Sequence, residues 1–358
     1  MNMQHEDVLA WLTGRSAAQV EARGFEAQTE HRGHGAHEHA DPDDERPAWG
    51  EAITHTRRNV ADMPTADSNR LKNALAAINT PSNPIWGRFV ALHRVLGTIV
   101  HGSAGRRFLP WHRLMLWHFE RVIRATREGS GAYIPYWTWW QEQSTGRKGI
   151  PAAWADFRPD IVMPTLADLD FLRQIGELLS SGTRTAMGNL ALGDMINLVI
   201  AGFLDPSGTS MLGTSLPVTR IARASLMRGD TSPQGRVLPD RAAVQDVLRR
   251  TSFWDMSNRL EDVHGAPHMW AGVNGRADGR ISDIGMSPCD ILFFFHHAEV
   301  DRLWHLWQNT AARRAPWTVT GTELPPWPET IAQVMSIGGA PLELAYENRA
   351  IDDPTRTP

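Results

Sequence analysis

The sequence predicts a mainly α fold with a central four-helix bundle, long loops and few short strands. Apolar residues recur at steps of three and four over several long segments, which is the spacing of a buried helix face. Segments rich in Gly, Ser and Pro separate these helices, and no internal repeat is present. Hydrophobic residues make up 42% of the 358 residues, enough for a sizeable core. The helical segments are 70–79, 85–101, 109–127, 242–264 and 291–308.

The strongest helical pattern covers residues 109–127. Pro110 fits just inside its start, because a first-turn residue needs no N–H donor. Its apolar stripe predicts a buried face. The stripe consists of Trp111, Leu114, Met115, His118, Phe119, Val122 and Ile123.

The N-terminal part differs in composition from the rest. Residues 1–48 are interpreted as an extension, with a short helix followed by a polar linker at 31–48 that is rich in Gly and Pro. The main domain is expected at 49–345, and 346–358 as a tail. The linker histidines are interpreted as solvated, because no apolar residues beside them would orient the rings. They are His31, His34, His37 and His39.

The remaining segments are connections and further helices. Residues 131–140 are rich in aromatic residues and Pro, which indicates extended chain. Residues 167–179 and 192–203 have helical patterns. Loops are expected at 205–240 and 272–290, where Gly, Ser and Pro are frequent.

Composition and the N-terminus exclude several classes of protein. The net charge of −4 argues against a nucleic-acid partner. A single cysteine excludes an internal disulfide and a Cys-rich zinc or iron–sulfur site. No signal peptide is recognised, Arg57 and Arg58 precede no apolar run, and no 18-residue apolar stretch could span a membrane. We therefore expect a cytoplasmic protein without a membrane partner.

The histidines gather beside the most aromatic segments. His264 and His268 are four residues apart, so on a helix they lie about 40° from each other. Pro267 between them is tolerated in a first turn, and a helix is therefore expected to begin near 265–267. His297 lies on the inward side of 291–308 and completes a three-nitrogen site.

A second trio consists of His93, His101 and His112, again in apolar surroundings. His118 also faces the apolar side, and periodicity alone does not exclude it. For any one of these residues, a core histidine bonded to backbone is the better interpretation. For six histidines in two clusters it is not, and we predict a binuclear metal site.

The donor type narrows the choice of metal. Imidazole suits zinc, copper, iron and nickel. Di-iron bundles use paired Glu-x-x-His motifs, and this chain has one, Glu261 to His264. A zinc protease has His-Glu-x-x-His, but Gly265 stands where the Glu is needed. Neutral histidines without thiolate or carboxylate favour copper by elimination.

Three segments resemble the tyrosinase family, the type 3 copper phenol oxidases. "FLPWHRLMLWHFE", residues 108–120, resembles the first copper-binding signature, and "DILFFFHHAEVD", residues 290–301, resembles the second. "LEDVHGAPHMWAG", residues 260–272, is similar to the paired-histidine segment. "IPYWTWW" and "RRNV" match commoner family phrases. The resemblance runs from about residue 50 to about residue 310.

The resemblance implies the ligand sets. His93, His101 and His112 would hold the first copper, and His264, His268 and His297 the second. His296, beside a ligand, is not expected to bind. The chain departs from the family pattern at Ile291, which replaces Pro, and in a longer gap between His101 and Phe108. Ile99 excludes the Cys–His thioether of some relatives, and the only cysteine, Cys289, lies elsewhere.

The implied activity is oxidation of o-diphenols to o-quinones with dioxygen, with hydroxylation of monophenols left open. Carboxylates beside the ligands are expected to orient the imidazoles. Glu261, three residues before His264, and Asp301, four after His297, are the candidates. The alternative for both is an ion pair, with Arg259 and Arg302 respectively.

Gly265 bears on the choice of substrate. In the family, an Asn directly after the first ligand of the second copper is associated with phenol hydroxylation, and Gly265 occupies that position. The resemblance therefore favours o-diphenol or o-aminophenol oxidation. Asp255, nine residues before His264, is a second candidate for holding a water that takes the proton of a phenol.

Two other classes of function are weighed beside the oxidase. A dioxygen carrier uses the same copper pair without turnover, and a binuclear zinc or iron hydrolase uses other metals. The partners expected are dioxygen and a small phenolic substrate. A homo-oligomer and a copper-delivery partner are left open.

Overall fold

The computed structural model describes parts of the chain from residue 55 onward. The described residues are 55–101, 107–144, 149–164, 222–223, 237–272, 280–283, 285–309, 324, 326–327, 329–338, 342–347 and 353–354. The predicted helices at 167–179 and 192–203, and the histidines of the 31–48 linker, lie outside them. The predicted domain boundaries stay a prediction.

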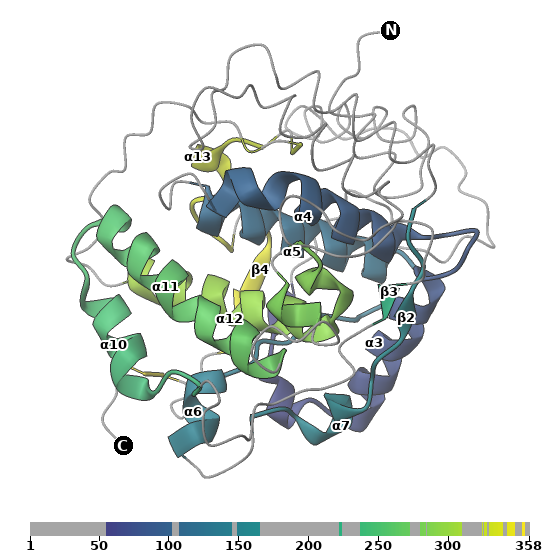
Figure 1. The fold of residues 1–358 in the computed structure, drawn as a ribbon, viewed down its shortest axis with the longest axis horizontal. Coiled ribbons are helices and arrows are strands. Elements are labelled where there is room, and N and C mark those ends of the chain that lie inside the picture. Colours follow the sequence, from purple (N-terminus) through teal and green to yellow (C-terminus); the bar gives the residue numbers. More distant parts are fainter. Residues whose placement is uncertain are drawn as a thin grey trace, which may run out of the picture.

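Four long helices form the centre of the molecule (Figure 1). Helix α4 packs on α5, and α12 packs on both α5 and α11. The predicted mainly α fold with a central four-helix bundle is confirmed. The four helices are α4 (Ile85–His101), α5 (Phe108–Arg124), α11 (Phe253–Ala271) and α12 (Ile291–Gln308).

Shorter elements surround the bundle. Helix α3 packs on α5, and α10 lies beside α11 (Figure 1). The 3-10 turns η2 and η3 precede α12. These elements are η1 (Val60–Asp62), α3 (Thr65–Ala77), α6 (Trp139–Ser144), α7 (Ala152–Ala155), α10 (Arg241–Arg249), η2 (Arg280–Ser282), η3 (Ser287–Cys289) and α13 (Ile331–Val334).

The described strands are short and form two pairs. β1 (His55–Arg57) pairs in parallel with β4 (Leu344–Tyr346), with His55 opposite Leu344 and Arg57 opposite Tyr346. β2 (Asp160–Ile161) pairs antiparallel with β3 (Ala222–Arg223). The first pair therefore joins the two ends of the described domain.

The segment 242–264 is two helices, where the sequence pattern predicted one. Arg250 is extended, and the side chain of Ser252 accepts a hydrogen bond from the Asp255 backbone N–H, which starts α11. The expectation that a helix begins near 265–267 is wrong, because α11 runs on through Pro267. Burial of Trp270 and Ala271 in the core outweighs the backbone hydrogen bond that Pro267 cannot donate.

A network of buried charges connects the bundle to the β1–β4 pair. The guanidinium of Arg57 donates to the carboxylate of Glu120 on α5, at 2.7 Å, and to the hydroxyl of Tyr346. Asp301 on α12 accepts from Arg113 of α5 at 2.5 Å and from Tyr346 at 2.6 Å. Burial alone would raise the pKa of Glu120, but Arg57 and His55 outweigh it and hold the pKa well below its usual range.

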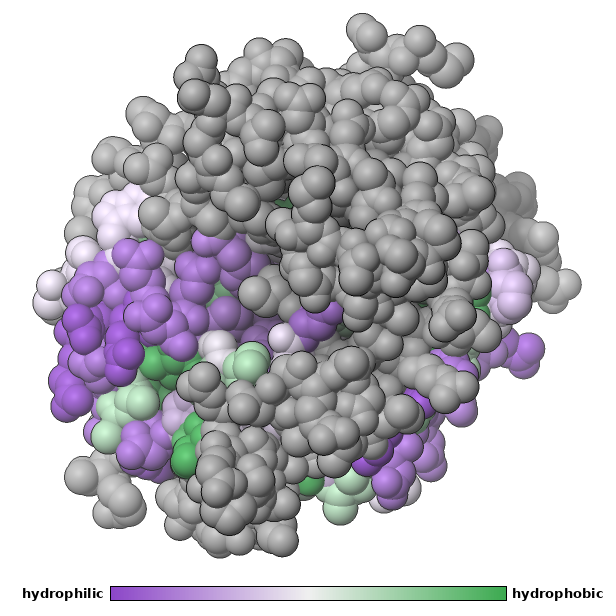
Figure 2. Space-filling view, viewed as in Figure 1, coloured by the Kyte–Doolittle hydropathy of each residue, from purple (hydrophilic) through white to green (hydrophobic). Residues whose placement is uncertain are grey.

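The surface of the described residues is polar. Val237 is the one large hydrophobic side chain among them that is exposed. Figure 2 shows hydrophilic residues gathered over α10 and α11, at the left of the view. Asp246 there binds both Arg250 and Arg259. Among the helices within the described ranges, none has the length and apolar character needed to cross a bilayer.

Gly87 in α4 lies in close contact with the backbone of residues 162–163, so a larger residue at this position should lower stability. A Cβ at this position would lie 2.1 Å from the carbonyl oxygen of Val162 and 3.0 Å from the Cα of Met163. We expect Gly87→Ala to lower the free energy of unfolding by about 1–3 kcal/mol, because backbone must move. Denaturant unfolding of the metal-free protein measures this.

The control is Gly265→Ala in α11, where an added Cβ would meet nothing within 4 Å. The better helix propensity of Ala should stabilise this variant by up to about 1 kcal/mol. A Gly87→Ala variant as stable as the parent would show that α4 and residues 162–163 are not packed as described.

Candidate metal centre

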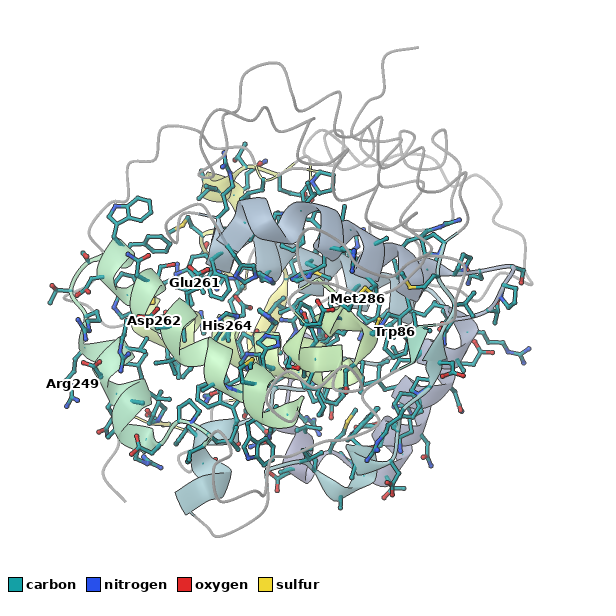
Figure 3. The ribbon with its side chains drawn as sticks, in the orientation of Figure 1. Trp86, Arg249, Glu261, Asp262, His264 and Met286 are labelled. Atoms are coloured by element: carbon teal, nitrogen blue, oxygen red, sulfur yellow. The ribbon has the colours of Figure 1, made fainter. Side chains whose placement is uncertain are left out.

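The bundle brings the histidines into two clusters. His93, His101 and His112 come from α4 and α5 and form the first cluster. The second combines α11 and α12, and Figure 3 shows its member His264 nearer the centre of the molecule than Glu261 of the same helix. In each cluster one candidate ligand atom per residue lies within 4.8 Å of the others. The second cluster consists of His264, His268, His296 and His297.

Ring orientation in the first cluster is set by hydrogen bonds on the outer side. His112 Nδ1 donates to the carbonyl of Phe108 at 2.8 Å. His101 Nδ1 donates to the carboxylate of Glu261 at 3.1 Å. The Nε2 atoms of His112 and His93 face each other at 3.5 Å. The bound Nδ1 atoms carry the protons, so the Nε2 lone pairs of His101 and His112 remain for a metal.

The second cluster follows the same scheme. His264 Nδ1 donates to the carbonyl of Glu261 at 2.5 Å, and His268 Nδ1 donates to the carbonyl of Ile281 at 2.8 Å. The Nε2 atoms of His268 and His297 are 3.4 Å apart. Two nitrogens on one tetrahedral metal are about 3.3–3.4 Å apart when each bond is about 2.0–2.1 Å. The donor set therefore fits a metal ion in each cluster.

The two clusters face each other. The rings of His112 and His297 stack with centroids 4.1 Å apart and an angle of 10°. His101 and His264 stack less closely, at 5.6 Å. This contact across the bundle is what a binuclear site requires.

Two buried phenylalanines line the space between the clusters, and sequence reasoning did not single them out. Phe108 contacts rings of both clusters, with centroids 4.6 Å from His264 and 5.0 Å from His112. Phe293 lies 4.3 Å from His297 and also contacts rings of the first cluster. Each lies four residues before a ligand on the same helix, a spacing that could have identified it. Both are buried and pack directly on the histidine rings.

Burial favours the neutral form of four of these histidines. It lowers the pKa of His112, His264 and His297 well below the usual value, and neighbouring histidines lower it further. Burial also lowers the pKa of His268, to about 4. Neutral imidazoles are the form that binds a metal, so protons compete only in acid.

The predicted orienting carboxylates have different roles from those expected. Glu261 bonds to the ring of His101 in the first cluster, while its carbonyl bonds to His264 in the second. Asp301 contacts no imidazole within the described residues and instead binds Arg113, the residue after His112. It also accepts a hydrogen bond from Tyr346, so it connects α12 to α5 and β4 beside the histidines.

The two arginines that were the alternative partners of Glu261 and Asp301 bind other carboxylates. Arg302 pairs with Glu299, not with Asp301, at 2.7 Å. Arg259 pairs with Asp246, not with Glu261. Both arginines therefore bind carboxylates away from the two clusters.

Gly265 and Asp255 lie far apart along α11. Their ten-residue separation corresponds to about 15 Å of helix. Asp255 is exposed and its carboxylate binds Arg250 at 3.2 Å, so it is not positioned to share a water with residue 265. Gly265 lies next to His264 with open space around the position of a Cβ.

His118 lies outside both clusters, whereas His296 lies inside the second. His118, which periodicity did not exclude, is outside both clusters, where it stacks on Trp327 and lies 3.4 Å from a carboxylate oxygen of Glu329. His296, expected not to bind, lies with the second cluster. Its neighbour Phe295 packs against Trp154, on the other side of α12.

Several known proteins are similar to this chain in sequence or in fold. The tyrosinase of Streptomyces glaucescens is 28% identical over 273 residues, covering 71% of this chain and 82% of that protein. The grixazone synthase of Streptomyces griseus subsp. griseus is 25% identical over 278 residues, covering 72% and 85%. A solved tyrosinase from Burkholderia thailandensis aligns with 17% identity and a TM-score of 0.49, covering 85% of this chain and 75% of that one.

A family model described as the common central domain of tyrosinase matches residues 83–310. The match spans more than half of the chain and contains both histidine clusters. The chain therefore belongs to the tyrosinase family of oxidoreductases, which use a binuclear copper site.

Proposed function

We propose that the protein uses dioxygen to oxidise o-diphenols, or the related o-aminophenols, and that monophenols are poorer substrates. The observation that carries this proposal is the pair of facing histidine clusters with their Nε2 atoms turned inward. The side-chain-free position Gly265 beside His264 supports the preference for o-diphenols.

Each group of residues has its own role in the proposed reaction. His93, His101 and His112 would hold one copper, and His264, His268 and His297 the other. When bound, the copper pair passes electrons from the phenolic substrate to dioxygen. Phe108 and Phe293 keep water from the histidine rings.

The need to remove a proton from the substrate explains the expected preference for o-diphenols over monophenols. A phenol must be deprotonated before it is hydroxylated, which requires a base or a water held as a base. Gly265 offers no acceptor, and Glu261, one turn earlier on α11, already accepts from His101. Catechols ionise readily and depend less on such a group.

Copper loading followed by turnover of matched substrates tests the proposal. The copper-loaded protein should oxidise a catechol and an o-aminophenol, releasing two o-quinones per dioxygen consumed with the catechol. The corresponding phenol should react more slowly. Reversible uptake of dioxygen without quinone formation would indicate a carrier instead. Zinc or iron in the isolated protein, with no oxidation of either substrate after copper loading, would indicate a hydrolase.

The proposal also covers where the protein is located and whether it assembles with other chains. We place the protein in the cytoplasm and leave open a homo-oligomer and a copper-delivery partner. Fractionation of expressing cells and mass measurement of the purified protein test these points.

The ligand assignment predicts a separable loss of each copper. His112→Ala should bind one copper, in the second cluster, and His297→Ala one copper, in the first. Both should lose oxidase activity, because one metal cannot complete the pair. Metal analysis and catechol turnover measure this. His118→Ala is the matched control on α5 and should keep two copper ions; full activity in either ligand variant would refute the assignment.

The contact between Glu261 and His101 predicts that a change at Glu261 weakens metal binding selectively in the first cluster. Glu261→Ala removes the carboxylate that fixes His101 Nδ1, and we expect the affinity for the first copper to fall about 10–100-fold. Copper titration against a competing chelator measures this. Asp262→Ala, an exposed carboxylate on the same helix, is the control. Equal affinities in the two variants would mean that Glu261 does not position His101.

Gly265→Asn predicts a change in substrate preference. The new amide would lie one turn from Glu261, so the two side chains can hold a water near His264. Residue 265 is helical, so Asn brings no backbone strain. The ratio of phenol to catechol turnover should rise. Gly265→Ala controls for added bulk. If Gly265→Asn, at equal copper content, has the same ratio of phenol to catechol turnover as the parent, phenol deprotonation depends on another part of the site.

A further inference from the structure

Trp327 is a buried tryptophan that the proposed reaction does not use. Its side chain is 2% exposed, and it lies beyond α12, outside the residues 83–310 that the family model matches. The indole N–H has no hydrogen-bond partner among the described residues. A buried donor without a partner is unfavourable, so hydrogen bonding does not explain a tryptophan at this position. The contacts of its large ring point to another reason.

The ring of Trp327 contacts both helices that supply the first cluster. Its centroid lies 6.5 Å from that of Phe89 on α4 and 6.0 Å from that of Trp111 on α5. Phe89 lies about one turn before His93, and Trp111 directly precedes His112. Trp327 therefore bridges α4 and α5 close to two of the cluster histidines.

Trp111 connects Trp327 with the rings of these histidines. Its own ring lies 6.0 Å from that of His93 and 5.2 Å from that of His112, measured between centroids. Trp111 is fully buried. In a close-packed interior, such a ring cannot shift without moving the side chains that it touches. The placement of Trp111 thus affects where the first-cluster imidazoles lie.

The C-terminal residues around Trp327 are fixed to α5 beside His112. Arg113, the residue after His112, donates to the carbonyls of residues 334 and 335 at 2.9 and 3.0 Å. The ring of His118, further along α5, stacks on that of Trp327 with centroids 4.5 Å apart and an angle of 12°. The segment that carries Trp327 is therefore held on the helix that supplies a ligand.

The second cluster has no contact of this kind. Within the part of the chain that the structure describes, no ring contact of Trp327 or Trp111 involves His264, His268 or His297. A change at Trp327 should therefore act on the first metal position and leave the second unchanged.

We propose that Trp327 is a positioning residue of the first metal position, where it holds Trp111 against the rings of His93 and His112. The inference rests on the ligand assignment proposed above and is independent of which phenol is oxidised. The competing explanation is that Trp327 only adds apolar burial to the core and so stabilises the whole fold. The experiment has to separate a selective effect on one metal position from a general loss of stability.

Two single-site proteins allow each metal position to be studied alone. His297→Ala should bind one metal ion in the first cluster, and His112→Ala one in the second. In the His297→Ala protein, we expect Trp327→Leu to weaken Co(II) binding about tenfold and to shift the visible bands of bound Co(II), because the nitrogen donors move. In the His112→Ala protein, Trp327→Leu should leave the Co(II) affinity unchanged. Titration against a competing chelator measures both affinities.

Trp154→Leu is the matched control. Trp154 is fully buried, and its ring packs against Phe157 and Phe295, which lie outside both clusters. This substitution should also destabilise the metal-free protein, but it should leave the Co(II) affinity and spectrum of the His297→Ala protein unchanged. The proposal is overturned if Trp327→Leu leaves that affinity and spectrum unchanged, or weakens both metal positions equally.

Trp327→Phe provides the test if Trp327→Leu does not fold. The smaller ring cannot keep every contact of the indole, so the first position should lose affinity by at least about threefold while the second keeps its affinity. An unchanged first position would overturn the proposal. A His297→Ala protein that binds no Co(II) at all would overturn the ligand assignment, and the proposal with it, which separates the two failures.

Discussion

The site depends on one constraint, the fixing of largely buried imidazole rings from their outer side by hydrogen bonds. Backbone carbonyls of Phe108, Glu261 and Ile281 accept from Nδ1 atoms, so the corresponding Nε2 lone pairs turn inward. Low dielectric makes such hydrogen bonds stronger and keeps the rings neutral. The hydrogen bonds thus orient these rings without a metal.

Helix-to-helix contacts hold these rings in register. Glu261 bonds to a histidine of the first cluster through its carboxylate and to a histidine of the second through its carbonyl, so α11 contacts both clusters. Arg113 and Asp301 hold α5 and α12 together beside His112 and His297. The Glu261 contact also fixes His101 in a chain whose Ile99 excludes a thioether. Breaking one of these helix-to-helix contacts should therefore change the geometry of the histidine clusters more than it lowers the stability of the fold.

The sequence was sufficient to predict the helices of the bundle and the histidines that meet there. The predicted segments 85–101 and 291–308 have the bounds of α4 and α12, because long apolar stripes are a strong local signal. Both histidine trios come together in the structure. The continuation of α11 through Pro267 was not predictable, because distant packing outweighs a local penalty.

Contacts between helices were the main source of error. Glu261 was expected to serve His264, three residues on, but its carboxylate reaches His101 on α4. Asp301 has partners from α5 and β4, which no spacing along α12 encodes. His296 lies with the second cluster, and the expectation that it does not bind a metal stays a prediction. Spacing predicts which face a residue occupies, not what lies opposite it.

The most direct test of the central claim is a crystal structure of the copper-loaded protein, with anomalous diffraction measured at the copper edge. The account predicts two peaks, one in each histidine cluster, each about 2.0–2.2 Å from inward-facing Nε2 atoms. A single peak, or copper bound only outside the two clusters, would contradict it.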